Sequence, residues 1–412
     1  MKKFFVLILL QCFLGYTIYG QKLSELYKKD VINLIPNVGF GKNTNWDTLF
    51  NKATQEPGKR KNLIVAPDGS IFVSQSNRHE IWKFDSNGNF VKRIGKKGSK
   101  LNEFPYTPTI EGIFNNQYIY TNDVQGRMKF FDFDGRFIKM LKLDYMPLNT
   151  VPLKDNKIAV LGFVVGNNSR YIVAIKDFNT GTEKIILSEP SYTAEKSIKI
   201  NYPEGGMFGF IAPYSETAPG IGVNSKDNLI LALRKTGTVE EYTPDGTKIN
   251  SFKLNIEPLK ITQDDINKSY ENGLKLVETI SENLNRTPKG KELSKEEKDR
   301  IINQARSQME KLKDPAMYPD HLPYFSTMII DSEGNLLFFE YTKVDQPATN
   351  HFKAFSYDMK GKYLGASSFK SENIDLSFNP DRFIFFKGMV YTIAKVQTKG
   401  AEKWQIIKME PK

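Results

Sequence analysis

The chain has almost no cysteine. Its 412 residues include a single one, Cys12, which lies in a stretch that is expected to be removed during export. A mature chain without cysteine excludes disulfide bridges and thiol chemistry, so its stability depends on the hydrophobic core. Long apolar runs are scarce as well. No stretch after residue 20 is apolar for long enough to cross a bilayer, so the sequence predicts no transmembrane span.

Motifs of common enzyme chemistries are also missing. The sequence has no phosphate-binding glycine loop, no nucleophile motif and no cluster with metal-ligand spacing. Its three histidines, His79, His321 and His351, are weak candidates for a metal site, because three imidazoles could bind zinc and activate water. Their positions in the repeat described below argue against convergence. The sequence therefore predicts no cofactor, and a divalent metal is the one alternative left open.

The amino terminus has the pattern of a secretory signal. Residues 1–3 are positively charged, and the apolar core that follows ends at Leu10, too short to cross a membrane. Cleavage is expected after Gly20, which makes residues 1–20 a signal peptide. A lipid on Cys12 is the disfavoured alternative, because Gln11 is a poor residue directly before a lipidated cysteine. We therefore expect an exported protein, either periplasmic or extracellular.

The chain is basic, with a formal net charge of +11 at pH 7. A basic surface attracts anionic partners at long range. For an exported protein this favours acidic glycans or membrane surfaces over nucleic acid, for which the sequence has no motif. A lysine-rich composition without functional meaning is the alternative explanation.

What the sequence does contain is a repeat of about 40 residues, a period typical of repeat architectures. The clearest copy runs from Asn62 to Ile94 and consists of four β-branched or aromatic segments separated by turns. Pro67-Asp68-Gly69 and Asp85-Ser86-Asn87-Gly88 are turn sequences that accept positive φ cheaply. The same two turn types recur to give six units, of which the last lacks its second turn. The repeat predicts an all-β fold, a six-bladed β-propeller with four-stranded antiparallel blades, over residues 62–412.

The sixth unit lacks a strand of its own, and we expect the missing strand to come from the amino-terminal segment, residues 21–61. Val31-Ile32-Asn33-Leu34-Ile35 has strand composition and precedes the first blade. As the outer strand of blade six it would join the two ends of the ring and cover an open edge.

The clearest copy resembles the repeats of NHL-type six-bladed propellers, in particular those of uncharacterised secreted bacterial proteins. The likeness rests on four segments: Pro67 to Val73, Asn77 to Ile81, Phe84 to Gly88, and Gly95-Lys96-Lys97-Gly98. The resemblance implies that the loop between the second and third strands of each blade lies on the same face as the connections between blades.

Two long insertions interrupt these connections, at residues 189–219 and 257–323, and both are therefore expected on that face. The second contains a helical hairpin, residues 262–313, between blades four and five. Capping-box spacing at Thr262–Asp265 and Ser294–Glu297 marks the two helix starts, and apolar residues follow at helical intervals. We expect the apolar stripe to pack on the propeller face. A lid and a docking surface are the alternatives.

Candidate binding residues fall on the same face. The first insertion carries aromatic side chains among glycines, which suit contact with a sugar or peptide or could plug the ring centre. Arginines in or beside the second-to-third strand loops could bind carboxylates or sulfates, or belong to the repeat structure. The aromatic candidates are Tyr202, Phe208, Phe210 and Tyr214, and the arginine candidates are Arg78, Arg127, Arg170 and Arg234.

Two functions remain from the sequence. The first is an exported, non-catalytic binding or scaffold propeller that engages a glycan, a peptide or a protein partner, with an anionic one favoured by charge. The alternative is a lyase or hydrolase that uses a metal or carboxylates at the ring centre. An enzyme needs several convergent ionisable groups at the axis, whereas a binding protein needs a pocket or a patch.

Overall fold

The computed structural model describes most of the chain after residue 21. The expected signal peptide lies outside the described part, as do Tyr202 and Tyr214 of the first insertion. The described residues are 22–51, 62–75, 78–165, 169–191, 197–201, 207–211, 218–286, 288–341, 351–372, 374–375, 383–398 and 401–412.

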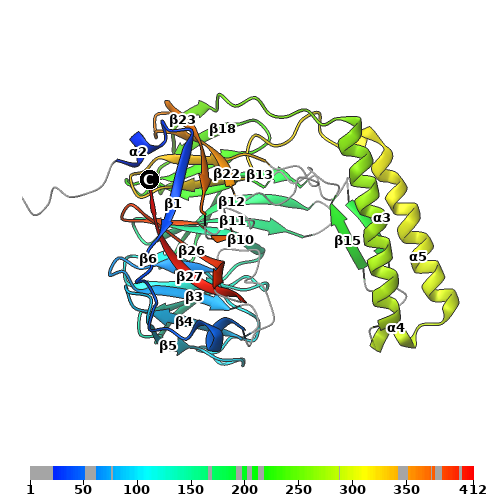
Figure 1. Ribbon diagram of the computed structural model, residues 1–412, viewed down its shortest axis with the longest axis horizontal. Coiled ribbons are helices and arrows are strands. Elements are labelled where there is room, and N and C mark those ends of the chain that lie inside the picture. Colours follow the sequence, from blue (N-terminus) through cyan, green and yellow to red (C-terminus); the bar gives the residue numbers. More distant parts are fainter. Residues whose placement is uncertain are drawn as a thin grey trace, which may run out of the picture.

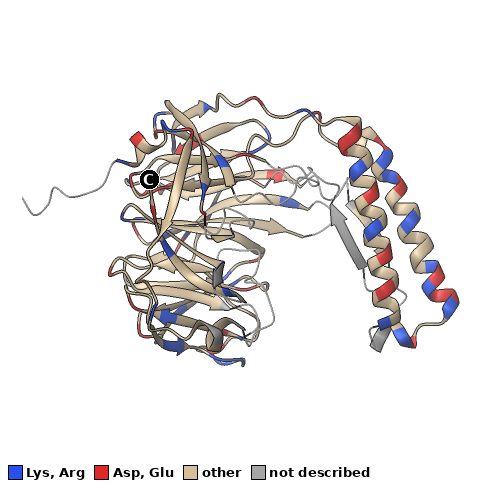
Figure 2. Ribbon diagram, viewed as in Figure 1, with Lys and Arg blue, Asp and Glu red and all other residues tan. Residues whose placement is uncertain are grey.

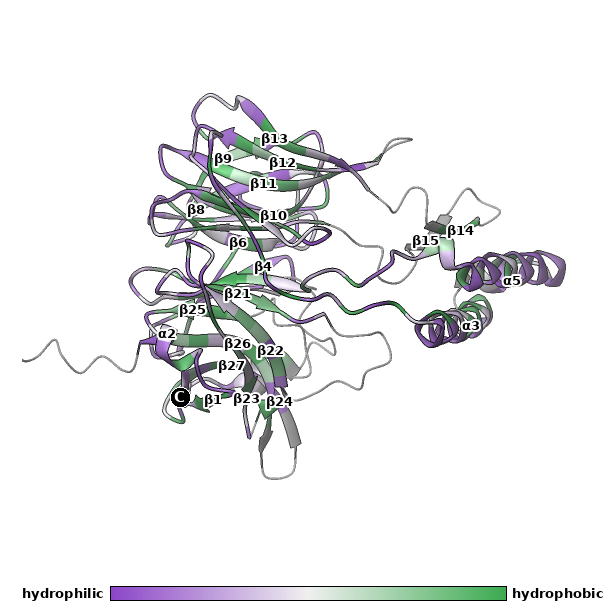
Figure 3. Ribbon diagram, turned by 90° about the horizontal axis from the view of Figure 1, so that it is seen from above, coloured by the Kyte–Doolittle hydropathy of each residue, from purple (hydrophilic) through white to green (hydrophobic). Residues whose placement is uncertain are grey.

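Antiparallel sheets set around a common axis form most of the molecule, in a propeller-like arrangement (Figures 1 and 3). In four of the sheets, four strands pair in chain order, as the repeat predicts. These sheets are β2 (Leu63–Val65), β3 (Ile71–Gln75), β4 (Glu80–Phe84) and β5 (Phe90–Ile94); β6 (Thr109–Phe114), β7 (Tyr118–Asn122), β8 (Arg127–Asp132) and β9 (Phe137–Lys142); β10 (Met146–Leu153), β11 (Lys157–Val164), β12 (Arg170–Asp177) and β13 (Glu183–Pro190); and β16 (Gly220–Val223), β17 (Leu229–Leu233), β18 (Thr238–Tyr242) and β19 (Lys248–Lys253).

The two ends of the chain meet in a nine-stranded sheet. Within it, β1 (Val31–Pro36) is shared between two groups of strands: its first half pairs in parallel with β23, and its second half pairs antiparallel with β27. The sequence led us to expect an outer strand here, but not the parallel pairing. The other strands of this sheet are β20 (Thr327–Ile330), β21 (Leu336–Phe339), β22 (His351–Tyr357), β23 (Tyr363–Lys370), β24 (Ile374–Asp375), β25 (Ile384–Phe386), β26 (Met389–Thr398) and β27 (Ala401–Pro411).

The turn glycines show how neighbouring sheets pack. In three sheets the glycine of the aromatic turn lies against the outer strand of the preceding sheet: Gly135 against Ile94, Gly246 against Ile186, and Gly361 against Phe252. Gly88 of the first repeat lies instead against Phe40, a few residues after β1, and a Cβ there would come within 2.8 Å of the ring. The segment containing β1 thus takes the place that an outer strand takes elsewhere.

Two short helical segments accompany the amino-terminal strand. They are α2 (Leu23–Leu26) and a π-helical turn, η1 (Asp47–Asn51). Leu23, Leu26 and Tyr27 are buried in the core of the nine-stranded sheet, which anchors the start of the described chain.

The predicted helical hairpin is confirmed, as α3 (Gln263–Arg286) and α5 (Lys295–Glu310). Ser294 and Glu297 form a full capping box, and Asp265 accepts a hydrogen bond of 2.8 Å from the Thr262 backbone. One more short helix lies between these two helices. The remaining elements here are α4 (Pro288–Glu292), η2 (Lys311–Lys313) and η3 (Pro315–Met317).

The helical hairpin does not pack on a face of the ring, and in this respect the prediction is wrong. Together with β14 (Ser197–Asn201) and β15 (Met207–Ile211) the helices form a separate unit that stands away from the sheets (Figures 1 and 3). We call β14, β15 and residues 261–322 the arm. Its core joins Ile198 and Ile200 of β14 to the apolar stripes of both helices. The described strands of the first insertion therefore cover the helices and do not plug the ring.

The outer faces of the arm helices carry charges of both signs (Figure 2). Several are paired along one helix, as Lys268 is with Asp264 at 2.7 Å. None of the helices described here is long and apolar enough to cross a membrane.

Candidate functional site at the ring axis

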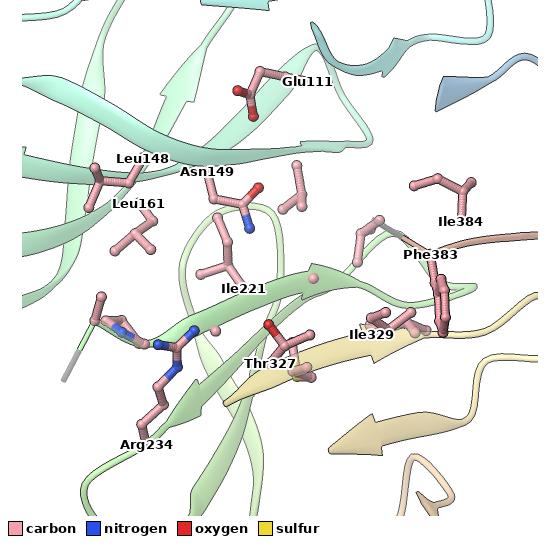
Figure 4. Close-up of a pocket in the computed structure, with 18 of the residues that line it drawn as sticks. Glu111, Leu148, Asn149, Leu161, Ile221, Arg234, Thr327, Ile329, Phe383 and Ile384 are labelled. Carbon is pink, nitrogen blue, oxygen red and sulfur yellow. The ribbon is translucent and has the colours of Figure 1, made fainter. Parts of the chain in front are cut away.

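The described part of the ring encloses a central cavity of about 510 Å³. Its walls come from the first strands of successive sheets, β6, β10, β16 and β20, and from the segment around β25. A cavity of this size is in the range of small-molecule sites. Figure 4 shows Asn149, Arg234 and Thr327 directed into the space, with Ile329, Phe383 and Ile384 forming a mostly apolar side.

Two β-bulges shape one wall of the cavity. The pairing of β6 with β7 shifts register between Ile110 and Gly112, and the pairing of β10 with β11 shifts between Pro147 and Asn149. The residues passed over are Glu111 and Leu148, and both line the cavity. A bulge leaves one residue out of the ladder and re-aims its side chain. The bulges therefore account for a carboxylate at this position in an inner strand.

Glu111 belongs to a small polar network within this wall. Its side chain is 4 % exposed, and it accepts a hydrogen bond of 3.2 Å from the Thr150 hydroxyl. The same hydroxyl lies 3.2 Å from the Tyr120 hydroxyl. Burial raises the pKa of Tyr120 well above its usual value, so this phenol stays neutral and acts as a hydrogen-bonding group.

Arg234 supplies the positive charge of the cavity. It lies in the turn between β17 and β18, and its guanidinium points into the space (Figure 4). The side chain packs over the Phe325 ring, with Cζ 5.9 Å from the centroid. Its Nε is buried and has no hydrogen-bond partner among the described residues. A buried donor of this kind favours an acceptor supplied from outside the protein.

The other three candidate arginines lie in or beside the second-to-third strand loops of their own sheets, with Arg127 and Arg170 as the first residues of third strands, and they do not line the cavity. Arg127 forms an ion pair with Asp123, with Nη2 at 2.7 Å and Nε at 2.8 Å from the carboxylate, and it packs on Tyr106. Arg78 lies over the Trp82 ring at 5.7 Å. Arg170 is exposed at the start of β12. These contacts fit the alternative that Arg127 belongs to the structure of the repeat and does not bind a ligand.

The aromatic candidates are placed only in part. Phe208 and Phe210 lie in β15 opposite Ile200 and Ile198 of β14, within the arm. This strand stands with the arm helices, away from the sheets of the ring (Figure 3).

The three histidines lie on separate elements. His79 contacts the Phe104 carbonyl through Nδ1 at 2.8 Å, and His321 contacts the Leu322 carbonyl at the same distance. His351 begins β22 and is exposed. Within the described ranges, no three His, Cys, Asp or Glu side chains are grouped so as to hold a metal ion.

Sequence reasoning identified one residue of the cavity, Arg234, and missed the rest of its polar lining. Thr109, Glu111, Asn149 and Thr327 lie near the starts of inner strands, at positions where the repeat pattern predicts only strand. The polar residues that interrupt these apolar strands could have indicated a polar cavity. The direction of the Glu111 side chain, however, depends on a bulge that the sequence does not predict.

Comparison with known proteins supports the fold. Residues 56–217, less than half of the chain, match the family DUF5128, described as a 6-bladed beta-propeller. A solved structure of a member of the duf4221 family from Bacteroides vulgatus is similar over 93 % of this chain and 99 % of its own, with 13 % identity and a TM-score of 0.50. The resemblance to six-bladed bacterial propellers is thereby confirmed.

Two further solved structures have lower TM-scores. A protein of unknown function from Bacteroides thetaiotaomicron has 11 % identity, a TM-score of 0.41, and coverage of 87 % of this chain and 71 % of its own. A streptogramin B lyase has 12 % identity, a TM-score of 0.40, and coverage of 92 % and 97 %. No curated protein matches the chain by sequence.

Proposed function

We propose that this protein is an exported, non-catalytic binding propeller that holds an anionic and partly apolar ligand in its central cavity. The observation that carries the proposal is Arg234, whose guanidinium points into the cavity while its buried Nε lacks a protein partner among the described residues. A guanidinium fork matches a carboxylate or a sulfate, and partial desolvation strengthens that interaction.

The lining favours binding over the alternative of a lyase or hydrolase. Among the described residues that line the cavity, Glu111 is the one carboxylate, and it is already engaged by Thr150. A carboxylate-dependent hydrolase needs a second group that acts as acid or base. The apolar side around Ile329 and Phe383 instead offers surface to bury.

In this proposal the ring has six blades. The four-stranded sheets are the first four, β20 to β23 form the fifth, and β24 to β27 with the second half of β1 form the sixth. The helices of the arm are then inserted between blades four and five, and β14 and β15 between blades three and four. Export is inferred from the signal pattern of residues 1–20, and the basic charge of the chain would favour arrival of an anionic ligand.

A thermal-shift titration of the purified protein tests the proposal. The probes are a uronic-acid disaccharide, a sulfated disaccharide and a tetrapeptide with a free carboxyl terminus, each paired with its uncharged counterpart. We expect at least one anionic probe to raise Tm in a saturable way and its counterpart to raise Tm less.

Arg234→Met keeps the aliphatic stem, and we expect it to abolish the shift. Arg170→Met is the matched control, because Arg170 lies beside the second-to-third strand loop of another sheet, is exposed and does not line the cavity. The proposal is contradicted if no probe shifts Tm, or if Arg234→Met responds as the unmodified protein does.

A further inference from the structure

The cavity exposes strand edges as well as side chains. Residues 219–223 and 327–330 line it as unbroken runs, which means that β16 and β20 face it along their backbones. A strand that presented one face would contribute alternate residues. Within the described chain, β16 pairs with β17 alone and β20 with β21 alone. The inward edge of each strand therefore carries backbone N–H and C=O groups that no sheet uses.

The packing between these two strands confirms their orientation. A Cβ on Gly222 would lie 2.7 Å from Ile330 Cδ1, and one on Gly220 would lie 3.2 Å from Met328 Cβ. The sides of the two strands that face each other are thus filled by contact between neighbouring sheets. Toward the axis the strands present their backbone edges and, on β20, the side chains of Thr327 and Ile329.

Arg234, in the turn between β17 and β18, lies beside the segment that leads into β20. The Arg234 carbonyl accepts a hydrogen bond of 2.9 Å from the Tyr324 backbone, and its side chain covers Phe325, just before β20 starts at Thr327. An extended ligand lying along β20 would bring one of its ends to the guanidinium. A carboxylate at that end would meet the fork directly.

We infer that the ligand is a short extended peptide, bound through its backbone to the inward edge of β16 or β20, with its carboxyl-terminal carboxylate on Arg234. This inference rests on the proposed function and specifies the ligand class. Added strands obtain affinity from main-chain hydrogen bonds and specificity from pockets for alternate side chains. Leu148, Ile329 and Ile384 offer apolar contacts of that kind.

The wall fits a peptide better than a glycan. Sugar rings are commonly held on aromatic faces, whereas the described lining is mostly aliphatic, with Phe383 and Phe385 as its aromatic members. The free strand edges supply alternating donors and acceptors at the spacing of a peptide chain.

Calorimetric titration of the purified protein with alanyl-valyl-alanyl-leucine tests the inference. Two modified peptides accompany it, one with an amidated carboxyl terminus and one with N-methyl groups at alternate residues, which remove main-chain donors without removing side chains. We expect each modification to weaken binding at least tenfold. In Arg234→Met we expect amidation to change affinity less than twofold, and Arg234→Lys should lie between Arg234→Met and the unmodified protein.

The outcomes separate the two claims. If a uronic-acid or sulfated disaccharide binds in an Arg234-dependent way and the tetrapeptide does not, the binding function stands and the peptide inference is wrong. Equal binding of the N-methylated peptide excludes pairing with a strand edge. If no anionic probe binds, both the peptide inference and the proposed function fail.

Discussion

The ring and the arm are built by different means. In the ring a contact between neighbouring sheets recurs: in three sheets the aromatic turn lies on the outer strand of the sheet before it. Lysines reinforce this arrangement, as when Lys184 donates to the Asp245 carbonyl at 2.8 Å. The arm has no repeat. Its single core is closed by Ile198 and Ile200, which arrive from a separate insertion.

The difference bears on how each part can change. The arm has a core of its own and joins the ring through connecting segments, one of which is braced where Leu322 donates to the Leu259 carbonyl at 2.8 Å. The ring depends on closure, because the free edge of its last sheet would be exposed without β1. We therefore expect damage to the closing segment to affect the whole ring and damage to the arm to stay local.

The largest effect is expected at Gly365 of β23. A Cβ at this position would overlap the Tyr27 carbonyl oxygen, so Gly365→Ala must displace the amino-terminal segment that closes the ring. We expect the free energy of unfolding to fall by about 3 kcal/mol, the cost of forcing extra volume into a packed site. Chemical denaturation would measure it. Gly39→Ala is the control, because its Cβ would make only an ordinary contact with Asn37 at 3.5 Å. If Gly39→Ala lost as much stability as Gly365→Ala, the loss at Gly365 could not be assigned to ring closure.

A smaller and local effect is expected in the arm. Met309 is fully buried in its core, and Met309→Ala should destabilise the arm by about 2.5 kcal/mol through lost contacts and a cavity. Hydrogen exchange should then be faster in α3 and α5 and unchanged in the ring strands. Asn303→Ala, on the exposed side of α5, should not speed exchange in either part. Faster exchange throughout the ring after Met309→Ala would show that the two parts fold as one unit.

The smallest effect concerns a buried pair at the ring closure and depends on pH. The Tyr27 hydroxyl donates to Asp331 at 2.6 Å, and Asn335 donates to the same oxygen at 2.8 Å. Burial raises the pKa of Asp331 above the usual 3.8, and these hydrogen bonds lower it in part. Because the folded-state pKa is the higher one, this group's contribution to stability is fully present below pH 3.8 and is lost as the pH rises through the folded pKa.

Tyr27→Phe removes one hydrogen bond to the charged carboxylate and so raises the pKa of Asp331 further. At pH 7 we expect the variant to be about 2 kcal/mol less stable than the unmodified protein, as for loss of a hydrogen bond to a charged group. The deficit should shrink at pH 3.8, where the carboxyl is more than half protonated in both proteins because its folded-state pKa lies above that value. Denaturation at the two pH values measures this, and a deficit independent of pH would mean that packing alone is lost.

Of the described residues that line the cavity, the sequence predicted only Arg234 as a candidate. The sequence placed Arg234 in a second-to-third strand loop, and the structure has it there, at the cavity. Arg127 lies just after the corresponding loop, as the first residue of β8, and its guanidinium pairs with Asp123. An arginine in or beside such a loop can thus line the cavity or form a local ion pair, depending on its position in the loop and on its neighbours. Glu111 could not be predicted, since its direction follows from a one-residue register shift.

The sequence by itself determined the repeat, its turns and the helix starts, since turn and capping preferences act between residues a few positions apart. Only the tertiary structure decided the rest: that β1 pairs in parallel with β23, that the arm helices pack on β14 and not on the ring, and that bulges place Glu111 and Leu148 in the cavity wall. Each of these depends on which distant surfaces meet and how closely they pack. No short stretch of sequence holds that information, because it belongs to the free energy of the whole assembled ring.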